Sequence, residues 1–426
     1  MRVGIIGGGI SGLTAAWLLD DSIGAGVDGV TLFERGHRLG GHAESVPTGD
    51  GFADLGAQHL APKAFPTHTR LLRWLGLDEE TIPSPLSVTV LSGRKPLLVT
   101  PHPELRPQPE GEEANASLRH LGTFLSRAAE LENDPNAWRL PTEDVVEPLD
   151  VPDPFKQEVL YPLMASFVGC SLEQTRGLSL RAAVAFLVRN APADPTQPPP
   201  WTNLRSGVER LATTLSGQLR NTRLRTGTEV IRVRPLEHGH EIVEGSGDTH
   251  RVDHVVFATP PWRVPDMLDE RADSETTRIL RRFRFVRAVV GLHRDPTYLS
   301  SARECRSTNT VTVSEPHEGA RWAETSTWYR PITGDELFKS WITHQRRQPT
   351  ELVAAREYHH PVPTVDHIAA QSELERVQGR SGKHFAGSWT VDVDSQESAV
   401  RSACLAVRRI LPSAPRLTVL GEPARQ

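Results

Sequence analysis

A short glycine-rich segment near the start of the chain limits most strongly what this sequence can fold into. The apolar run Arg2–Ile6 leads directly into Gly7-x-Gly9-x-x-Gly12, which is followed by a helical pattern and by a second apolar run, Val30–Glu34. Strand, tight turn, helix and strand in this order form one βαβ unit. The first glycine permits the turn, the second lets a pyrophosphate approach the backbone, and the third lets helix and strand pack closely. The segment therefore predicts a dinucleotide-binding fold.

The beginning of the predicted helix is a phosphate-binding element. The backbone N–H groups of Ile10 and Ser11 have no partner inside the helix, and the helix dipole adds positive charge there. Glu34 follows Gly12 by 22 residues and ends the second strand. A carboxylate in this place accepts hydrogen bonds from both ribose hydroxyl groups and repels a 2′-phosphate.

Length and composition bound the remaining possibilities. With 426 residues, of which 38% are hydrophobic and 24% charged, the chain is long enough for two domains. A formal net charge of −5 and scattered basic residues argue against nucleic-acid binding. The three cysteines, Cys170, Cys305 and Cys404, are far apart and indicate a reducing compartment, with no metal site. No charged leader and no run of about 18 apolar residues is present, so we expect a cytoplasmic protein without a transmembrane segment.

The pattern along the chain predicts a discontinuous nucleotide-binding domain. Helical patterns at Leu118–Leu131 and Leu178–Val188 precede the proline-rich connection Pro195–Pro200. Strand signals at Glu229–Val233 and Val252–Ala258 are expected to rejoin the nucleotide-binding sheet. We expect the nucleotide-binding domain at 1–60, 201–261 and 380–426, and a substrate domain at 62–200 and 262–379.

The later part of the chain shows two further patterns. Arg282–Leu292 alternates like a half-exposed strand. The stretch Lys383–Ile410 predicts a short strand, a loop and an amphipathic helix from Glu397 onward.

The residues after Glu34 resemble a known cofactor fingerprint. Glu34, Arg38 and the pair Gly40-Gly41 are similar to the extended FAD fingerprint of the flavin amine oxidase and carotenoid desaturase superfamily, and Asp54-Leu-Gly-Ala57 is similar to the next stretch of that pattern. The resemblance implies FAD as the cofactor. It also implies a glutathione-reductase-like βαβ fold of the α/β class, with a discontinuous FAD/NAD(P)-binding domain and an inserted α+β substrate domain.

The C-terminal part carries a second resemblance. Phe385–Thr390 and Ser395–Ser402 are similar to the end of the desaturase-like members, where a strand reaches the pyrophosphate and the next helix points its N-terminus at the flavin. Ser388 replaces the usual acidic residue, and Ala403 stands where glycine is common, which implies altered cofactor contacts rather than lost binding. The residues that we expect to bind FAD are Gly7, Gly9, Ile10, Ser11, Gly12, Glu34, Arg35, Arg38, Gly40, Gly41, His42, Gly56, Ala57, Gln58, Val230, Ala258, Thr259, Pro260, Gly387, Ser388, Glu397, Ser398, Ala399 and Val400.

A narrower resemblance concerns the middle of the chain. Leu292–Pro296, Tyr358–Val362 and Ala369–Gln371 are similar to predicted NAD/FAD-binding amine-oxidase-like proteins, whose genes often neighbour those of cyclopropane fatty-acid synthases. The association suggests a fatty-acyl or other lipid-like substrate by analogy alone.

Three histidines are the candidate catalytic residues. His359 and His360 are candidates for groups that face the substrate, and the alternative is a structural pair at a strand end. His59 is a candidate for the neighbourhood of the flavin. Lys339 is a further candidate, for the lysine that many amine oxidases place near flavin N5, although its sequence surroundings carry no specific mark.

Together these observations predict an FAD-dependent oxidoreductase. An oxidase or desaturase would transfer hydride from a small organic substrate, including a lipid-like one, to flavin N5, and molecular oxygen or another acceptor would take the electrons. Two alternatives are a flavin amine oxidase acting on a small amine, and a non-redox isomerase, cyclase or accessory protein with structurally bound FAD. The sequence does not predict the substrate, the electron acceptor or the oligomeric state.

Overall fold

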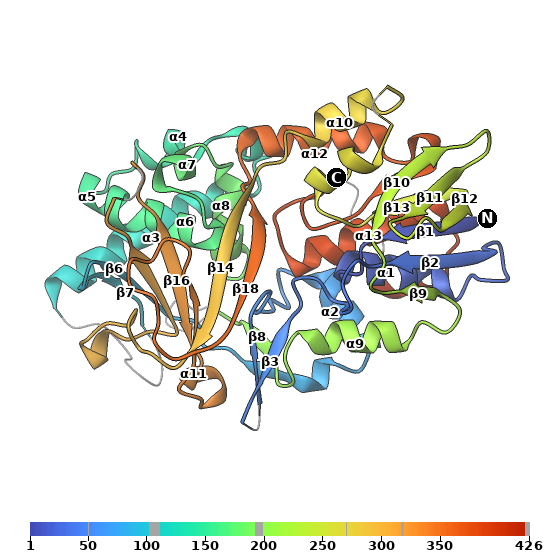
Figure 1. Cartoon of the computed structure of the whole chain (residues 1–426). Helices are drawn as coiled ribbons and strands as arrows, with labels where there is room; N and C mark the ends of the chain where they lie inside the picture. Colours follow the sequence, from blue (N-terminus) through green and yellow to red (C-terminus); the bar gives the residue numbers. More distant parts are fainter. Residues whose placement is uncertain (50, 102–110, 192–198, 270, 317–318, 422–426) are drawn as a thin grey trace.

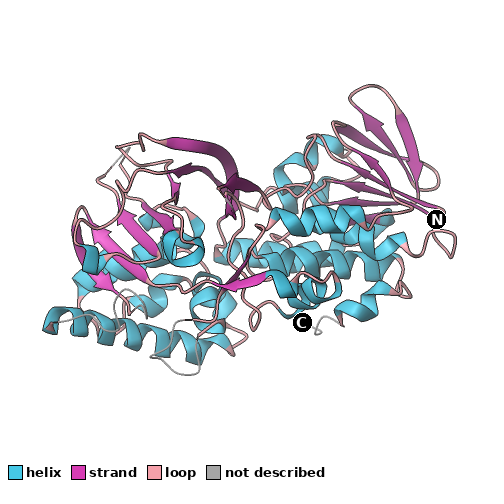
Figure 2. Ribbon diagram, turned by 90° about the horizontal axis from the view of Figure 1, so that it is seen from below, coloured by secondary structure: helices cyan, strands magenta, loops and turns pink. Residues whose placement is uncertain are grey.

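The chain folds into two lobes that lie side by side (Figures 1 and 2). A computed structural model describes all residues except 50, 102–110, 192–198, 270, 317–318 and 422–426. Most of the proline-rich connection expected at Pro195–Pro200 is therefore outside the described residues. Among the described residues, no helix is long and apolar enough to cross a membrane.

The first lobe is built on a parallel sheet of five strands that includes the predicted βαβ unit. Its strands in spatial order are β19 (Lys383–Phe385), β13 (His254–Phe257), β1 (Arg2–Ile6), β2 (Gly29–Phe33) and β9 (Arg223–Arg225). The sheet thus unites strands from three distant parts of the sequence. The apolar strands β1 and β13 match central strands of a parallel sheet that is buried on both faces.

Helices cover one face of the parallel sheet. They are α1 (Ile10–Asp20), α2 (Pro66–Trp74), α9 (Glu209–Gly217), α13 (Gln396–Ile410) and α14 (Arg416–Leu420). The residues of α1 from Ser11 to Asp20 are all buried, because the helix lies between the sheet and α13. A helix that is apolar all round needs such a covered position.

The other face of the parallel sheet carries a small antiparallel sheet, and here one sequence prediction is wrong. The strands β10 (Val230–Pro235), β11 (His240–Glu244) and β12 (Thr249–Val252) form a separate sheet, so the predicted strand at Glu229–Val233 does not rejoin the parallel sheet. In β10 only two positions are buried, which suits a strand with one solvated face but not a central parallel strand. The unpredicted β9 occupies the sheet edge beside β2 instead.

The second lobe contains a mixed sheet of seven strands (Figure 1). In spatial order these are β18 (Leu352–Pro361), β14 (Phe285–His293), β17 (Phe338–Trp341), β16 (Ala323–Trp328), β15 (Asn309–Val313), β6 (Val88–Ser92) and β7 (Lys95–Val99). The pairing is antiparallel except between β15 and β6. Two stretches that are far apart in the sequence therefore share one sheet.

Helices pack on one end of this sheet and form its core. They are α3 (Glu112–Glu132), α4 (Thr142–Val146), α5 (Asp153–Phe155), α6 (Tyr161–Val168), α7 (Leu172–Arg176) and α8 (Leu180–Arg189). The remaining helices are α10 (Ser274–Leu280), α11 (Arg330–Thr333) and α12 (Val365–Val377). The short hairpin β3 (Ser45–Thr48) and β4 (Gly51–Asp54), and the pair β5 (Thr81–Pro83) and β8 (Thr202–Leu204), lie between the lobes.

Candidate active site

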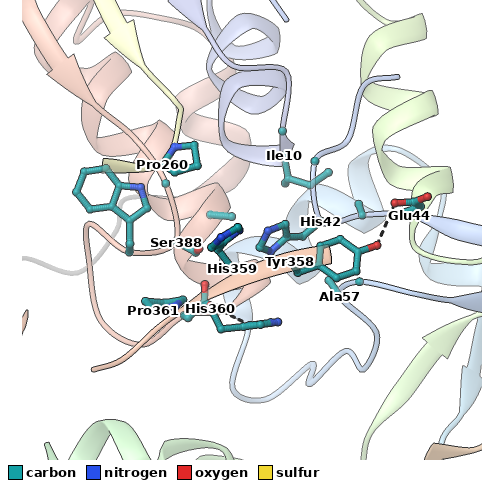
Figure 3. A pocket seen from close by; sticks show the side chains of 18 of the residues that line it. Ile10, His42, Glu44, Ala57, Pro260, Tyr358, His359, His360, Pro361 and Ser388 are labelled. Atoms are coloured by element: carbon teal, nitrogen blue, oxygen red, sulfur yellow. Dashed lines mark hydrogen bonds and ion pairs between the residues drawn. The ribbon is translucent and has the colours of Figure 1, made fainter. Parts of the chain in front are cut away.

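A cavity of about 1050 Å³ lies between the lobes, and residues of both line it. Figure 3 shows part of its wall, where His42, His359, His360 and Ser388 gather beside Tyr358 and Glu44. Most of the residues expected to bind FAD line this cavity. They are Gly7, Gly9, Ile10, Ser11, Glu34, Arg35, Arg38, Gly40, Gly41, His42, Gly56, Ala57, Gln58, Val230, Ala258, Thr259, Pro260, Gly387, Ser388 and Ala399.

The glycine turn before α1 brings the backbone up to the cavity. Gly7 has φ +111°, and a Cβ there would lie 2.4 Å from the carbonyl oxygen of Ala258. Gly12 does not line the cavity, because it is packed under the turn, where a Cβ would lie 1.9 Å from the carbonyl oxygen of Gly7. At Gly9, the N-cap of α1, no side chain caps the helix. The first backbone N–H groups of α1 are thus left for a ligand.

The carboxylate of Glu34 is fixed at the end of β2. It accepts hydrogen bonds from the backbone N–H groups of Gly8, at 2.7 Å, and Gly36, at 2.8 Å. These two bonds orient the side chain without using the full accepting capacity of its oxygens. The carboxylate can therefore still accept hydrogen bonds from a diol.

Arg38 stabilises a second glycine turn that faces the first one. Its guanidinium donates to the carbonyl oxygens of Gly41, at 2.5 Å, and Ala43, at 2.8 Å. Gly40 and Gly41 both have positive φ, and Gly40 bridges to Gly9. The spacing of the sequence fingerprint thus corresponds to two backbone turns in contact.

Only one side of the first helical turn of α13 faces the cavity. Gln396 and Ala399 line the cavity, whereas Glu397, Ser398 and Val400 do not. The Glu397 carboxylate instead accepts hydrogen bonds from the backbone N–H groups of Thr67 and His68, at the start of α2. Consecutive helical residues point about 100° apart, so positions three apart share a face. Gln396 was not among the residues expected to bind FAD, but its spacing of three from Ala399 places both on the face of the helix that lines the cavity.

His59 is held in the cavity wall by two polar side chains. Its Nδ1 lies 3.0 Å from Oδ1 of Asn203 and 3.2 Å from Oγ of Ser84. Burial lowers the pKa of His59 to about 4, so the imidazole is neutral near pH 7. When Nδ1 carries the proton that Asn203 accepts, Nε2 is left as a basic nitrogen.

The other two histidines come from β18. The ring of His360 stacks on Trp341 at 4.7 Å, and its Nδ1 lies 3.7 Å from Oδ2 of Asp394. Burial favours a raised pKa for Asp394, but hydrogen bonds from His360 and Ser388 outweigh it and lower the pKa. His359 is half-exposed and packs against Trp262. Asp394 stands alone in a loop, and no sequence pattern around it predicts a site.

Another histidine, His42, lies beside His360 and Tyr358. His42 is 5.8 Å from the ring of His360 and 5.1 Å from that of Tyr358. Burial and the neighbouring His360 lower the pKa of His42 to about 4. Its imidazole therefore stays uncharged at neutral pH and can act as a hydrogen-bonding group.

Lys339 of β17 reaches from the second lobe into the cavity wall. Its ammonium donates to the carbonyl oxygen of Gly56, at 2.6 Å, and to Oε1 of Gln58, at 3.1 Å. Burial lowers its pKa to about 8, partly offset by the carboxylate of Asp54. Burial in turn raises the pKa of Asp54 to about 6.

One end of the cavity, here called the substrate chamber, has a different character. It is formed where α6, α8 and Trp201 face the strands β6, β15, β16 and β17. The side chains that line it are mainly apolar or aromatic. They are Phe65, Leu86, Val88, Leu163, Ser166, Phe167, Phe186, Trp201, Asn309, Val311, Thr325, Thr327, Lys339, Trp341 and His59.

The other part of the cavity fits FAD on three observations. The first backbone N–H groups of α1 have no side-chain cap, and a carboxylate with a fixed orientation lies at the end of β2. Two glycine turns leave room for a ligand close to the backbone. In addition, Gln58 Nε2, Thr259 Oγ1 and Gln396 Oε1 are buried at the cavity without a partner among the described residues. Buried polar atoms are rarely left unpaired, so these atoms indicate a polar ligand.

The fold and this cavity define the class of FAD-binding oxidoreductases with a βαβ nucleotide domain. Residues 10–291 match the flavin containing amine oxidoreductase family, and the chain belongs to this family. The expected fold class, the FAD cofactor and the oxidoreductase class are thereby confirmed.

Individual relatives agree with this assignment. The chain is 29% identical, over 291 residues, to a coproporphyrinogen III oxidase of Mycobacterium bovis; the match covers 62% of this chain and 60% of that protein. Cyclohexylamine oxidase of Brevibacterium oxydans has a similar structure, with a TM-score of 0.65, 18% identity, and coverage of 97% of this chain and 99% of the other. A CLA-producing fatty acid isomerase of P. acnes also has a similar structure, with a TM-score of 0.66 and 15% identity. That match covers 96% of this chain and 98% of the other. At identities this low, the comparison with these two structures shows only that this chain has the same fold.

Proposed function

We propose that this protein removes hydride from a carbon atom of a small organic substrate, as an FAD-dependent oxidase or desaturase. One observation carries the proposal: a single cavity joins the glycine turn of α1 to an apolar chamber in the other lobe. FAD, when bound, supplies the two-electron acceptor, and molecular oxygen or another acceptor later regenerates it. The substrate loses a hydride and a proton and gains a double bond.

The residues of the first lobe would bind and orient the cofactor. The first backbone N–H groups of α1 would donate to the diphosphate, and the Glu34 carboxylate would accept from the ribose hydroxyl groups. Gln58 Nε2 and Thr259 Oγ1, which are buried without partners among the described residues, would complete the polar contacts.

His59 is our candidate for the group that accepts the substrate proton. It is neutral, it lines the chamber, and Asn203 and Ser84 fix its ring. Its Nε2 is unprotonated and available to a substrate proton, although burial makes this imidazole a weaker base than a solvated one. His360 and His359 lie farther along the wall, beside Asp394 and Trp262, and we propose that they position ligands there.

Anaerobic titration tests the proposal. Purified protein saturated with FAD is mixed with candidate substrates without oxygen, and the visible flavin absorbance is recorded. Stoichiometric bleaching that returns to the oxidised spectrum with air supports an oxidase or desaturase. Turnover of a substrate to an isomer, with a spectral shift but no net reduction, would contradict the proposal and favour a non-redox role.

A further inference from the structure

We propose that the substrate chamber selects an uncharged, largely apolar group, such as a hydrocarbon chain or ring, and excludes ionised amines. This inference rests on the proposed function, because it identifies the chemistry of the substrate for the same site. It is carried by the charges and the hydrogen bonds of the chamber wall.

The chamber offers no counter-ion for an amine cation. Among the described residues that line it, Lys339 is the one side chain that bears a charge at neutral pH, and its ammonium already donates to Gly56 and Gln58. Burial keeps His59 neutral. An ionised amine that entered would lose its water without gaining an opposite charge, and it would face the like charge of Lys339, which is strongly unfavourable.

The polar groups of the chamber wall are partly engaged with one another. Thr327 Oγ1 donates to Oδ1 of Asn309 at 2.7 Å, and Ser166 Oγ donates to the carbonyl oxygen of Leu163 at 2.7 Å. Groups satisfied in this way do not require polar atoms on a ligand. The wall is therefore compatible with hydrocarbon and with an occasional uncharged polar atom.

Aromatic rings form the side of the chamber opposite the sheet. Phe186 lies 6.3 Å from each of Phe65, Phe167 and Trp201, measured between ring centroids. Phe167 is 40% exposed, so apolar surface continues from the chamber to solvent. A continuous apolar path of this kind is typical of an entrance for apolar ligands.

Two features could instead hold an amine cation. Aromatic faces attract cations, but the gain is smaller than the loss of hydration unless an anion is also present. Trp341 of the chamber wall stacks on His360, and His360 in turn contacts the carboxylate of Asp394. Asp394 is therefore separated from the chamber by these two rings, and His360 is already its partner. The other nearby carboxylate, Glu44, accepts from Tyr358 and from Arg356. Both are thus engaged.

Binding of matched small probes to the FAD-saturated protein tests the inference. Octanol and octylamine form a chain set, and cyclohexanol and cyclohexylamine form a ring set; each compound is titrated at pH 7 while the flavin spectrum is followed. We expect the neutral member of at least one set to bind at least about ten-fold more tightly than the amine of that set. The set with the tighter neutral member shows whether a chain or a ring fits better.

Substitution at Thr325 supplies a matched control. Thr325 lines the chamber from β16 and is half-buried. Thr325→Asp should reverse the preference, so that the amine binds more tightly than the neutral probe. Thr325→Asn introduces a side chain of the same size as aspartate without its charge, and it should keep the preference for the neutral probe. The inference is overturned if an amine binds the unmodified protein as tightly as its neutral counterpart, or if neither neutral member binds.

These results are separate from the test of the proposed function. Probe binding needs bound FAD but no turnover, so charge selectivity can be lost while flavin reduction persists. Conversely, a protein that binds neutral probes and never reduces its flavin would refute the proposed oxidation alone.

Discussion

Glu34 illustrates how a single side chain prepares a ligand site in this protein. Two backbone N–H groups, from Gly8 and Gly36, hold its carboxylate before any ligand binds. Such preorganisation reduces the entropy lost on binding. The same bonds also stabilise the turn, so removal of the carboxylate affects both the site and its frame.

The substitution Glu34→Ala should weaken FAD binding by about ten-fold or more, because a charged hydrogen-bond acceptor is worth about 1.5–3 kcal/mol. The ratio of flavin to protein after dialysis against dilute FAD, together with a binding titration, measures the effect. Glu79→Ala, at an exposed position, is the matched control and should retain full affinity. Equal affinity of both variants would remove Glu34 from the proposed site.

Lys339 has a pKa of about 8 in the folded protein and 10.5 as its ordinary value. Between these values the unfolded chain binds more protons than the folded one, so this lysine makes the unfolding free energy rise as pH increases from 8 to 10.5. The whole effect amounts to about 3 kcal/mol at most.

We expect Lys339→Met to lose this rise with pH. Urea unfolding of FAD-saturated protein at intervals from pH 7 to pH 10 measures it. The stability of the unmodified protein relative to the variant should increase toward high pH. Lys95→Met, which removes an exposed lysine, should leave the pH dependence unchanged. A difference between Lys339→Met and the unmodified protein that is constant with pH would contradict burial of an ammonium at this site.

At the scale of elements, the N-termini of two helices supply the backbone N–H groups that matter most for the site and its frame. The beginning of α1 is uncapped by side chains and faces the cavity. The beginning of α2, in contrast, is satisfied from another helix, by Glu397 of α13. Two helix N-termini thus have different roles, one for a ligand and one for the contact between elements.

The substitution Glu397→Ala should destabilise the protein by about 1–2 kcal/mol, because it leaves two buried N–H groups of α2 without an acceptor. Urea unfolding measures the loss. FAD affinity, determined on the folded variant, should change little, since this carboxylate does not line the cavity. A large loss of FAD affinity with unchanged stability would support the role that the sequence resemblance implied.

At the scale of the whole molecule, the site depends on the joint between the lobes. Lys339 bonds to Gly56 across 283 residues of sequence. Arg189 of α8 forms a bidentate ion pair with Asp392, at 2.9 and 3.0 Å, across 203 residues. Both contacts connect the seven-stranded lobe to segments that surround the cofactor part of the cavity.

A double-mutant cycle with Arg189→Met and Asp392→Asn should show a coupling free energy of about 1–3 kcal/mol, because both side chains are largely buried and the geometry is bidentate. Thermal or urea unfolding of the four proteins gives this value. The pair Arg287 and Glu357, exposed on the second lobe, offers a control cycle with coupling below about 1 kcal/mol. Additive effects at Arg189 and Asp392 would show that the ion pair does not join the lobes.

The sequence by itself determined the local elements of the cofactor site. Gly7, Gly9 and Glu34 have fixed spacings because one turn, one helix and one strand separate them, so their mutual positions follow from local geometry. For the same reason the helix predicted at Leu178–Val188 agrees closely with α8, and the helix predicted at Leu118–Leu131 lies inside α3, which begins at Glu112.

Tertiary structure decided what local pattern could not express. The strand at Val230 joined a separate sheet because its pairing depends on a partner, β11, and not on its own residues. Lys339, Asp394 and Phe186 reach the cavity through long-range packing, and nothing in their immediate sequence marks them. Hydrogen-bonded turns are encoded by neighbours in the chain, whereas a cavity is enclosed by side chains whose proximity exists only after the lobes have packed together.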